Sequence, residues 1–197
     1  KDTLEGLEGV EFTFTSKTTG KTVTKITTDK EGKATTAVKG KRGALPYDTY
    51  VVAETKCPEG LKPIEPFEVT IKEEGVTLKG IYKEDKLIVS PVSVVKKDKS
   101  TGETIPVKNT EFRLLDANKN AITMTTHYPD KVVHETFKTD EKGQFTLPDK
   151  LKHGTYYLEE LHAPEGYLKG ELLEFRVEKG ATWENPLIVE YFDDHAM

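Results

Sequence analysis

Three ionisable side chains occupy matching positions in three segments that have the alternating pattern of β-strands. They are Lys96, Glu160 and Asp193. Because successive side chains of a strand point to opposite faces, each of the three shares a face with the apolar residues two and four positions before it. An amine and two carboxyl groups that meet in an apolar interior can form a buried ion pair. The pattern therefore predicts one inward-facing charged cluster.

A different strand register is the alternative. A shift of one residue would turn each of the three charged groups to the other face of its strand, and so into water. Isolated charges are costly to bury, and Lys, Glu and Asp are mostly exposed, which favours the exposed arrangement for any three arbitrary strands. Here, however, one amine and two carboxyls fall in the first, a middle and the last strand of one predicted domain. This coincidence favours a shared cluster.

The segments that must position these groups are short and alternate between apolar and polar residues. They lie at residues 10–14, 67–71, 111–115, 173–178 and 187–192. Turn sequences rich in Asp, Pro and Gly separate them, and no stretch keeps a helical period over three turns. The sequence therefore predicts an all-β protein built from antiparallel immunoglobulin-like sandwiches.

The sequence also repeats itself with a period of about 100 residues, which suits one sandwich domain per repeat. YVVAETKCPEGL at residues 50–61 matches YYLEELHAPEGY at residues 156–167. We therefore expect two tandem domains, residues 1–90 and 91–197. The second repeat has an additional stretch at residues 122–137, which we expect to form an extended hairpin.

Charge and hydropathy narrow the range of partners. The chain of 197 residues carries 34 acidic and 29 basic residues, a net charge of -5, which argues against a nucleic-acid or anionic-membrane surface. No apolar run approaches the roughly 18 residues of a membrane span, and no signal-peptide pattern begins at Lys1. We expect an excised fragment or mature region without membrane contact.

Several other kinds of chemistry lack their residues. Cys57 is the only cysteine, so there is no internal disulfide and no cysteine-based zinc site, and we expect it to be a small buried hydrophobe. The five histidines lack metal-ligand spacing. No serine lies in a nucleophile elbow, and no glycine-rich loop leads into a helix. We expect no metal, no cofactor and no enzymatic turnover.

The residues around the charged positions resemble a known family, the Cna B-type domains of Gram-positive surface adhesins and pilins. The family pattern K-x-D-x-x-T-G is matched by KKDKSTG at residues 96–102. Its glutamate box, Y-x-L-x-E-x-x-A-P-x-G-Y, is matched by residues 156–167, and its closing strand by VEYFD at residues 189–193. The resemblance covers nearly the whole chain, twice, and the glutamate box is its most specific part.

The resemblance implies a spontaneous isopeptide bond between the Lys96 amine and the Asp193 side-chain carboxyl, promoted by Glu160. Burial favours the neutral form of an amine, which is the nucleophile, and two adjacent carboxyls share a proton more readily than both ionise. The glutamate can then polarise the aspartyl carbonyl and carry protons while one water leaves. Asn185 is the alternative acceptor. We rank it below Asp193, because it precedes a proline and lies too early in the strand.

In the first repeat the same resemblance assigns Glu54 to the glutamate position and Asp85 to the acceptor. The alignment places the reactive lysine one residue before Lys1. Lys1 itself would face away from the core and would serve only if the terminus shifted its register.

The implied function is structural: a stalk or pilin segment in the cell wall or pilus of a Gram-positive bacterium, with neighbouring domains or pilus subunits as partners. One alternative is an adhesin module that uses the hairpin at residues 122–137 to contact a host extracellular protein or glycan. Another is an accessory domain of a secreted carbohydrate-active enzyme, for which Trp183 alone would have to supply the aromatic platform.

Overall fold

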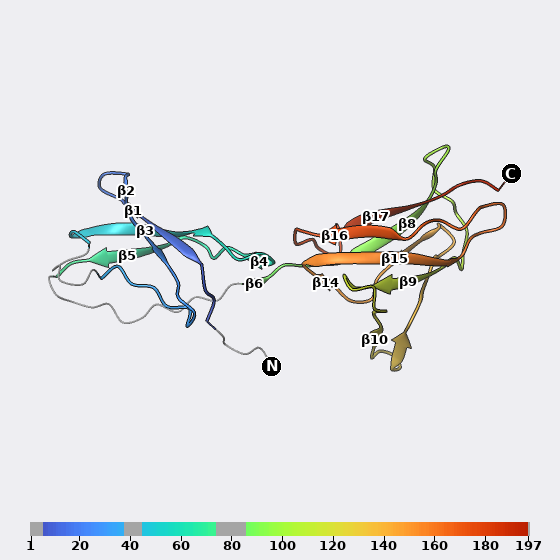
Figure 1. Cartoon of the computed structure of the whole chain (residues 1–197), viewed down its shortest axis with the longest axis horizontal. Helices are drawn as coiled ribbons and strands as arrows, with labels where there is room; N and C mark the ends of the chain where they lie inside the picture. Colours follow the sequence, from blue (N-terminus) through green and yellow to red (C-terminus); the bar gives the residue numbers. More distant parts are fainter. Residues whose placement is uncertain (1–5, 38–44, 74–85, 197) are drawn as a thin grey trace. The chain divides into compact units, whose positions relative to one another are not determined.

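The computed structural model describes residues 6–37, 45–73 and 86–196, and every regular element in this part of the chain is a β-strand. The chain divides into two compact units, Lys1–Leu87 and Ile88–Met197 (Figure 1). The predicted all-β class is confirmed. The described residues contain no helix long and apolar enough to cross a membrane.

The first unit contains a four-stranded antiparallel sheet in the order β2-β1-β3-β5. Its strands are β1 (Glu11–Ser16), β2 (Thr22–Thr27), β3 (Asp48–Lys56) and β5 (Phe67–Ile71). Two further strands form a short antiparallel pair: β4 (Leu61–Lys62), which lies between β3 and β5 in the chain, and β6 (Lys86–Leu87), which follows β5. Phe14 and Val52 face each other across β1 and β3, and Tyr50 and Val69 complete the buried side of this sheet together with Leu45.

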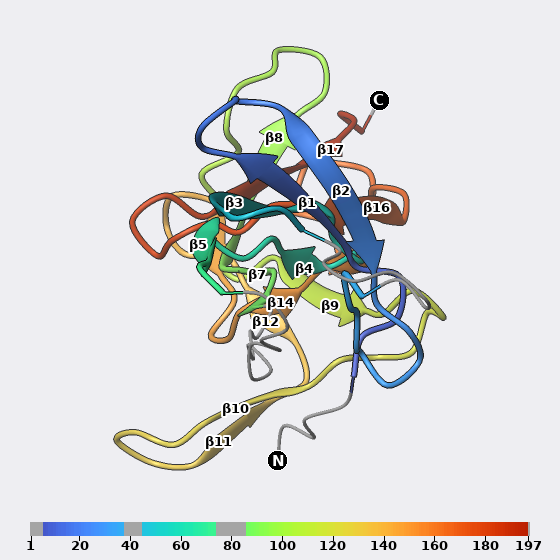
Figure 2. The same ribbon diagram turned by 90° about the vertical axis from the view of Figure 1, so that its left-hand side faces the viewer.

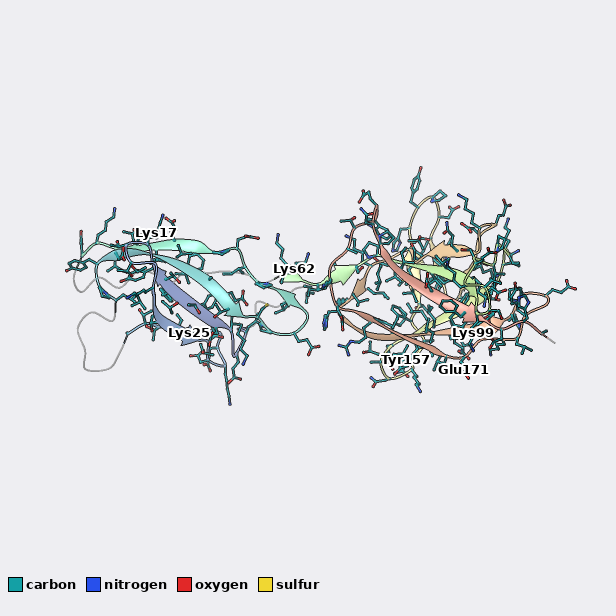
Figure 3. All side chains as sticks on the ribbon, turned by 90° about the horizontal axis from the view of Figure 1, so that it is seen from above. Lys17, Lys25, Lys62, Lys99, Tyr157 and Glu171 are labelled. Atoms are coloured by element: carbon teal, nitrogen blue, oxygen red, sulfur yellow. The ribbon has the colours of Figure 1, made fainter. Side chains whose placement is uncertain are left out.

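The other face of this sheet is polar, as the alternation predicts. Lys17 and Lys25, both labelled in Figure 3, pair with Glu68 at 2.7 Å and Glu11 at 3.1 Å. These pairs are largely exposed, so each contributes little to stability.

The sequence T-D-x-x-G occurs at residues 28–32 and again at residues 139–143, and it forms the same turn in both units. Asp29 accepts two backbone N–H groups through its Oδ1, and Asp140 does the same in the second unit. Gly32 and Gly143 follow with φ of 72° and 71°, a left-handed conformation that favours glycine. A Cβ on Gly143 would also lie 1.9 Å from the carbonyl oxygen of Ile105. The glycine is therefore required for both backbone conformation and space.

The second unit has two main sheets, with strand orders β12-β9-β15-β16 and β13-β8-β17. The first sheet contains β9 (Glu111–Leu115), β12 (Phe137–Lys138), β15 (Gly154–His162) and β16 (Leu173–Val177). The second contains β8 (Val92–Asp98), β13 (Gln144–Thr146) and β17 (Leu187–Asp193). A short pair is formed by β7 (Val89–Ser90), which precedes β8, and β14 (Leu151–Lys152), which lies between β13 and β15.

One ladder of the second unit is parallel, although the sequence predicts antiparallel sheets. β17 pairs with β8 in parallel, with Val189 beside Val94 and Tyr191 beside Lys96. Parallel neighbours need a long connection, and here nearly the whole domain lies between the two strands. Periodicity within a segment carries no information on the direction of its partner, so this pairing could not be read from the sequence.

Side chains from both sheets form one core in the second unit. Val94 and Val189 from one sheet pack with Phe112, Leu158 and Val177 from the other, all buried. Burial of such a side chain contributes roughly 1.5–3 kcal/mol. This apolar core surrounds the charged positions predicted from the sequence.

A projecting hairpin lies within residues 122–137, while Phe137 at the end of this stretch belongs to β12 and is buried in the core. β10 (Met124–Thr126) pairs antiparallel with β11 (Val132–His134), and Figure 2 shows the pair standing away from the sheets of its own domain. Tyr128 at its tip is 91% exposed, and Val132 and Val133 are 46% and 54% exposed.

Candidate functional site

Lys96, Glu160 and Asp193 lie together in the core of the second domain. Lys96 projects from β8 and Asp193 ends β17, so both belong to one sheet, whereas Glu160 projects from β15 in the other sheet. Each is a buried position in a strand whose burial alternates. The inward register, and not its one-residue alternative, is therefore the one that the structure adopts.

The lysine amine contacts both acids. Lys96 Nζ lies against Glu160 Oε1 and against Asp193 Oδ2, and all three side chains have no exposed surface. Neither Asp193 oxygen makes a hydrogen bond of normal geometry with the described residues, so its contact with the amine is an ion-pair approach. An amine that touches an otherwise unpartnered carboxyl in a dry site is arranged for condensation as well as for charge pairing.

Two aromatic rings enclose the amine. Lys96 Nζ lies 4.7 Å from the ring centroid of Tyr191 and 5.5 Å from that of Phe112. The rings themselves meet edge to face, with centroids 5.0 Å apart. They exclude water from the amine and lower the local dielectric, which strengthens its interaction with the acids.

The glutamate is held at its second oxygen. The backbone N–H of Gly170 donates to Glu160 Oε2 at 2.9 Å. With Oε2 occupied, Oε1 is the oxygen that faces Lys96. The hydroxyl of Tyr191 donates to the carbonyl of Glu171 at 2.7 Å, which fixes the segment carrying Gly170 against β17.

Burial changes the acidity of the site. It raises the pKa of Asp193 to about 6, against the lowering effect of the Lys96 charge and with a further increase from Glu160. Burial also raises the pKa of Tyr191, and the charges of Glu160 and Asp193 add to this effect. A larger fraction of Asp193 than of an ordinary aspartate is therefore protonated as the pH falls toward 6, and the protonated form is the one that can lose a hydroxyl as water.

A second cluster lies just beyond the site. His195 Nε2 pairs with Asp98 Oδ2 at 2.6 Å, and the Tyr167 hydroxyl donates to the same oxygen at 3.2 Å. Burial raises the pKa of Asp98, but the backbone N–H groups of Thr101 and Ser100, together with the His195 charge, hold it below its usual range.

This second cluster ties the end of β17 to two turns. The rings of Tyr167 and His195 stack 4.7 Å apart, and the two residues form an isolated β-bridge. Lys99, labelled in Figure 3, pairs with Asp194 at 2.9 Å. Asp98 and Tyr167 lie within the two sequence motifs at residues 96–102 and 156–167, whereas no sequence pattern predicts a role for His195. Its partner lies 97 positions earlier, a distance that no local pattern reveals.

The competing acceptor lies elsewhere. Asn185 is exposed in the turn before β17, where its N–H donates to the Thr182 hydroxyl at 3.2 Å. Asp194 is also exposed. Of the acceptors weighed from the sequence in this repeat, Asp193 is the one in contact with Lys96.

The first domain repeats part of this arrangement. Glu54 in β3 accepts a hydrogen bond at Oε2 from the backbone N–H of Ile64, at 2.8 Å, and its Oε1 is buried without a hydrogen-bond partner among the described residues. The other two predicted participants, Lys1 and Asp85, lie outside the described residues.

Cys57 is half-buried and not the fully buried hydrophobe expected. Its thiol donates to the carbonyl of Leu61 at 3.4 Å. The residue begins the turn that ends β3, and there the chain leaves the core.

Comparison with known proteins identifies a family whose sequence pattern matches both domains. A family described as SpaA, prealbumin-like fold domain, matches residues 1–86 and again residues 90–186. A search of curated protein sequences finds no match.

Among solved structures, the Bacillus anthracis TIE protein superposes with a TM-score of 0.67 at 23% identity, over 99% of this chain and 32% of that protein. The chain thus spans about a third of that protein's length. The minor pilin GBS52 of Streptococcus agalactiae gives a TM-score of 0.46 at 20% identity, over 98% of this chain and 85% of the pilin. The shaft pilin SpaA of Lactobacillus rhamnosus GG gives a TM-score of 0.41 at 16% identity, over 98% of this chain and 87% of the pilin.

The TIE likeness supports the fold alone, and the family match carries the assignment because it covers nearly the whole chain in two tandem copies. The expected tandem β-sandwich fold and the resemblance to adhesin and pilin domains are both confirmed. The chain belongs to the SpaA prealbumin-like fold domain family and contains two such domains.

Proposed function

We propose that the second domain forms a spontaneous isopeptide bond between Lys96 Nζ and Asp193 Cγ, with Glu160 as the proton carrier. The observation that carries the proposal is the contact of one fully buried amine with two fully buried carboxyls. Burying three such charges is costly for an ion pair alone, and replacing them by apolar residues would often stabilise a fold. A covalent product accounts for the arrangement better than charge pairing does.

The reaction balances within these three residues. The Lys96 ammonium gives one proton to Glu160 Oε1, and the neutral amine attacks Cγ of the protonated Asp193. The new C–N bond forms as the C–O bond to the departing hydroxyl breaks, and a second proton from nitrogen joins that hydroxyl to make water. Glu160 ends the reaction protonated. Each molecule reacts once, so the chain is not an enzyme in this proposal.

The bond would join the first long strand of the domain to the last. It closes a loop of about 100 residues, which by analogy with disulfides stabilises by roughly 4–5 kcal/mol in the chain-entropy model. Tension entering at β8 and leaving at β17 would pass through the bond and would not reach the sheets between them. The parallel β8–β17 ladder supports this role, because it brings the two reacting strands side by side.

The role that fits such a domain is structural. We infer a stalk or pilin segment of a Gram-positive surface protein, extracellular and joined to neighbouring domains or pilus subunits. Membership of the SpaA family and the resemblance to Cna B-type adhesin and pilin domains support this role.

Peptide mapping tests the proposal directly. Digestion of the unfolded chain with trypsin, followed by tandem mass spectrometry, is expected to yield one branched peptide that contains both Lys96 and Asp193. Linear peptides carrying an unmodified Lys96 and an unmodified Asp193, in full yield, would refute it.

The projecting hairpin supports a second candidate function, contact with a host extracellular protein or glycan. Its apolar side chains Tyr128, Val132 and Val133 are exposed, and a cavity of about 390 Å³ lies at its base, lined by His134 and Phe137 among others. Exposed apolar residues on a protruding loop are typical of binding surfaces. A screen against matrix proteins and glycans, repeated with the hairpin shortened to a two-residue turn, tests this function. Binding that survives shortening would exclude the hairpin.

A further inference from the structure

Gly170 lies where the three reacting groups meet the loop between β15 and β16. Its N–H donates to Glu160 Oε2 at 2.9 Å. A Cβ at this position would lie 2.5 Å from Tyr191 Cε1, 2.8 Å from Tyr191 Oη and 2.8 Å from Asp193 Oδ1. Eight other glycines of the described chain have a positive φ, and Gly170 is not among them. The glycine is therefore needed here for space and not for backbone conformation.

We propose that Gly170 is a positioning residue for bond formation, through its N–H donor and through the absence of a side chain. This inference rests on the proposed isopeptide reaction. Neither feature is part of the reacting trio. The absence of a side chain is unique to glycine, since every other residue carries a Cβ, whereas the N–H donor is available from any residue except proline.

The donor sets which carboxylate oxygen faces the amine. A carboxylate has two equivalent oxygens, and a buried one without a second partner could rotate or withdraw from the lysine. The Gly170 N–H holds Oε2, so Oε1 stays in contact with Lys96 Nζ. The proton acceptor is thus aimed before the reaction begins, which is the kind of preorganisation that accelerates a reaction in a dry site.

The missing side chain sets the position of the acceptor. Asp193 Oδ1 and the ring of Tyr191 both occupy the space that a Cβ on Gly170 would need. Because real Cβ atoms do not approach other heavy atoms so closely, an alanine would push Asp193, Tyr191 or the loop away. Displacing Asp193 would move Cγ off the line of attack from Lys96 Nζ.

The first domain separates the two features. Ile64 follows Glu54 by the same ten residues that separate Gly170 from Glu160, and its N–H makes the same donation to Oε2. The donor therefore occurs in both domains, whereas the residue that supplies it in the first domain carries a side chain. This repetition supports a role for the backbone donor that does not depend on glycine.

Two variants test the two features. Gly170→Ala fills the space and keeps the donor, while replacement of Gly170 by glycolic acid, which makes a backbone ester, removes the donor and adds no atom. Both are made in the full chain by cell-free synthesis, and the loss of water is followed by intact mass over time. Lys169→Ala serves as the exposed neighbouring control. Val177→Ala serves as a buried control, because it weakens the same core at the opposite end of β16.

We expect Gly170→Ala to slow bond formation by about 100-fold, the cost of misplacing a reacting group by about 1 Å. The ester variant is expected to slow it by about tenfold, the rate cost of losing one ordinary hydrogen bond that positions the glutamate. Both controls are expected to react near the wild-type rate. Gly170→Ala should also lower the pH at which the rate is half-maximal, since a displaced Asp193 is less buried, whereas Val177→Ala should leave that pH unchanged.

The outcomes distinguish this inference from the proposed function. A wild-type chain that never loses water refutes both. A wild-type chain that loses water while both Gly170 variants react at its rate, or only as slowly as Val177→Ala, refutes the positioning role alone. If Gly170→Ala does not fold, the ester decides, because it introduces no steric conflict.

Discussion

Tyr191 lies directly beside Lys96 in the parallel β8–β17 ladder, and its ring centroid is 4.7 Å from the lysine Nζ. This register places Asp193 two residues further along the same face of β17, where its carboxyl meets the extended lysine side chain. A shift of the ladder by one residue would turn the aspartate outward. The contact between amine and acceptor therefore depends on the pairing of the first long strand with the last.

Removal of the proton carrier is expected to stop the reaction. Glu160→Ala should leave the second domain unbonded, because the lysine loses the base that accepts its proton. The unbonded domain should also be less stable than the bonded wild-type domain by roughly 4–5 kcal/mol, the contribution of the loop that the bond closes. Intact mass and urea denaturation measure the two effects. A Glu160→Ala chain that still lost this domain's water would exclude a catalytic role for the glutamate.

The identity of the acceptor can be read from the leaving group. Asp193→Asn is expected to lose ammonia and not water if it reacts, whereas Asp193→Ala should not react at all. Asn185→Ala is the matched control, because Asn185 is exposed in the turn before β17 and should not affect the mass loss. Loss of the mass deficit in the Asn185 variant would reassign the acceptor.

The rate of bond formation is expected to fall as the pH rises through about 6, the value to which burial raises the pKa of Asp193. Below that pH the folded site holds a protonated Asp193, whose hydroxyl can leave as water. Above it Asp193 ionises, and a carboxylate is a poor electrophile. Time courses of intact mass after cell-free synthesis, between about pH 5 and pH 8, measure this profile. A rate that rises steadily across the range would contradict the assignment.

The Asp98–His195 pair is expected to hold the end of β17 in place. The pKa of Asp98 is lower in the folded chain than in the unfolded chain. Its interactions therefore stabilise the fold fully when the pH is above the unfolded-state pKa, and this stabilisation is lost as the pH falls through the folded-state pKa. His195→Ala should lower the midpoint of thermal unfolding, and this difference from wild type should shrink in acid. Lys99→Ala, which removes only an exposed pair with Asp194, should have little effect. If the two substitutions lowered the unfolding midpoint equally, the Asp98–His195 pair would have no specific role in holding the end of β17.

Force spectroscopy is expected to separate bonded from unbonded second domains. A bonded domain should not extend, because the load between β8 and β17 passes through the covalent link. In Glu160→Ala the same domain should unfold and release on the order of 350 Å of chain, from about 100 residues at roughly 3.5 Å each. Equal extension of wild type and variant would show that the link does not carry the load.

The sequence predicts the trio because strand alternation is a local property. Lys96, Glu160 and Asp193 each follow apolar residues at a spacing of two, and burial of those residues fixes the face on which all three lie. The choice of Asp193 over Asp194 as the inward-facing aspartate is also predictable from the alternation, since Asp194 falls on the exposed face.

The rest depends on contacts that no local pattern encodes. Gly170 acts through a backbone N–H, which every residue except proline has, and its need for space becomes visible only when Tyr191 and Asp193 are packed against it. The parallel direction of β17 and the pairing of His195 with Asp98 likewise join segments from opposite ends of the domain.

The central claim is tested most directly by the intact mass of the folded wild-type chain compared with that of Lys96→Met, which keeps the length of the side chain and removes the nucleophile. For each protein the mass deficit is the calculated mass of the chain minus the measured mass. We predict that the deficit of wild type exceeds that of Lys96→Met by the mass of one water, whatever the state of the first domain. If both proteins depart from their calculated masses by the same amount, Lys96 and Asp193 form only a buried ion pair and the covalent account is wrong.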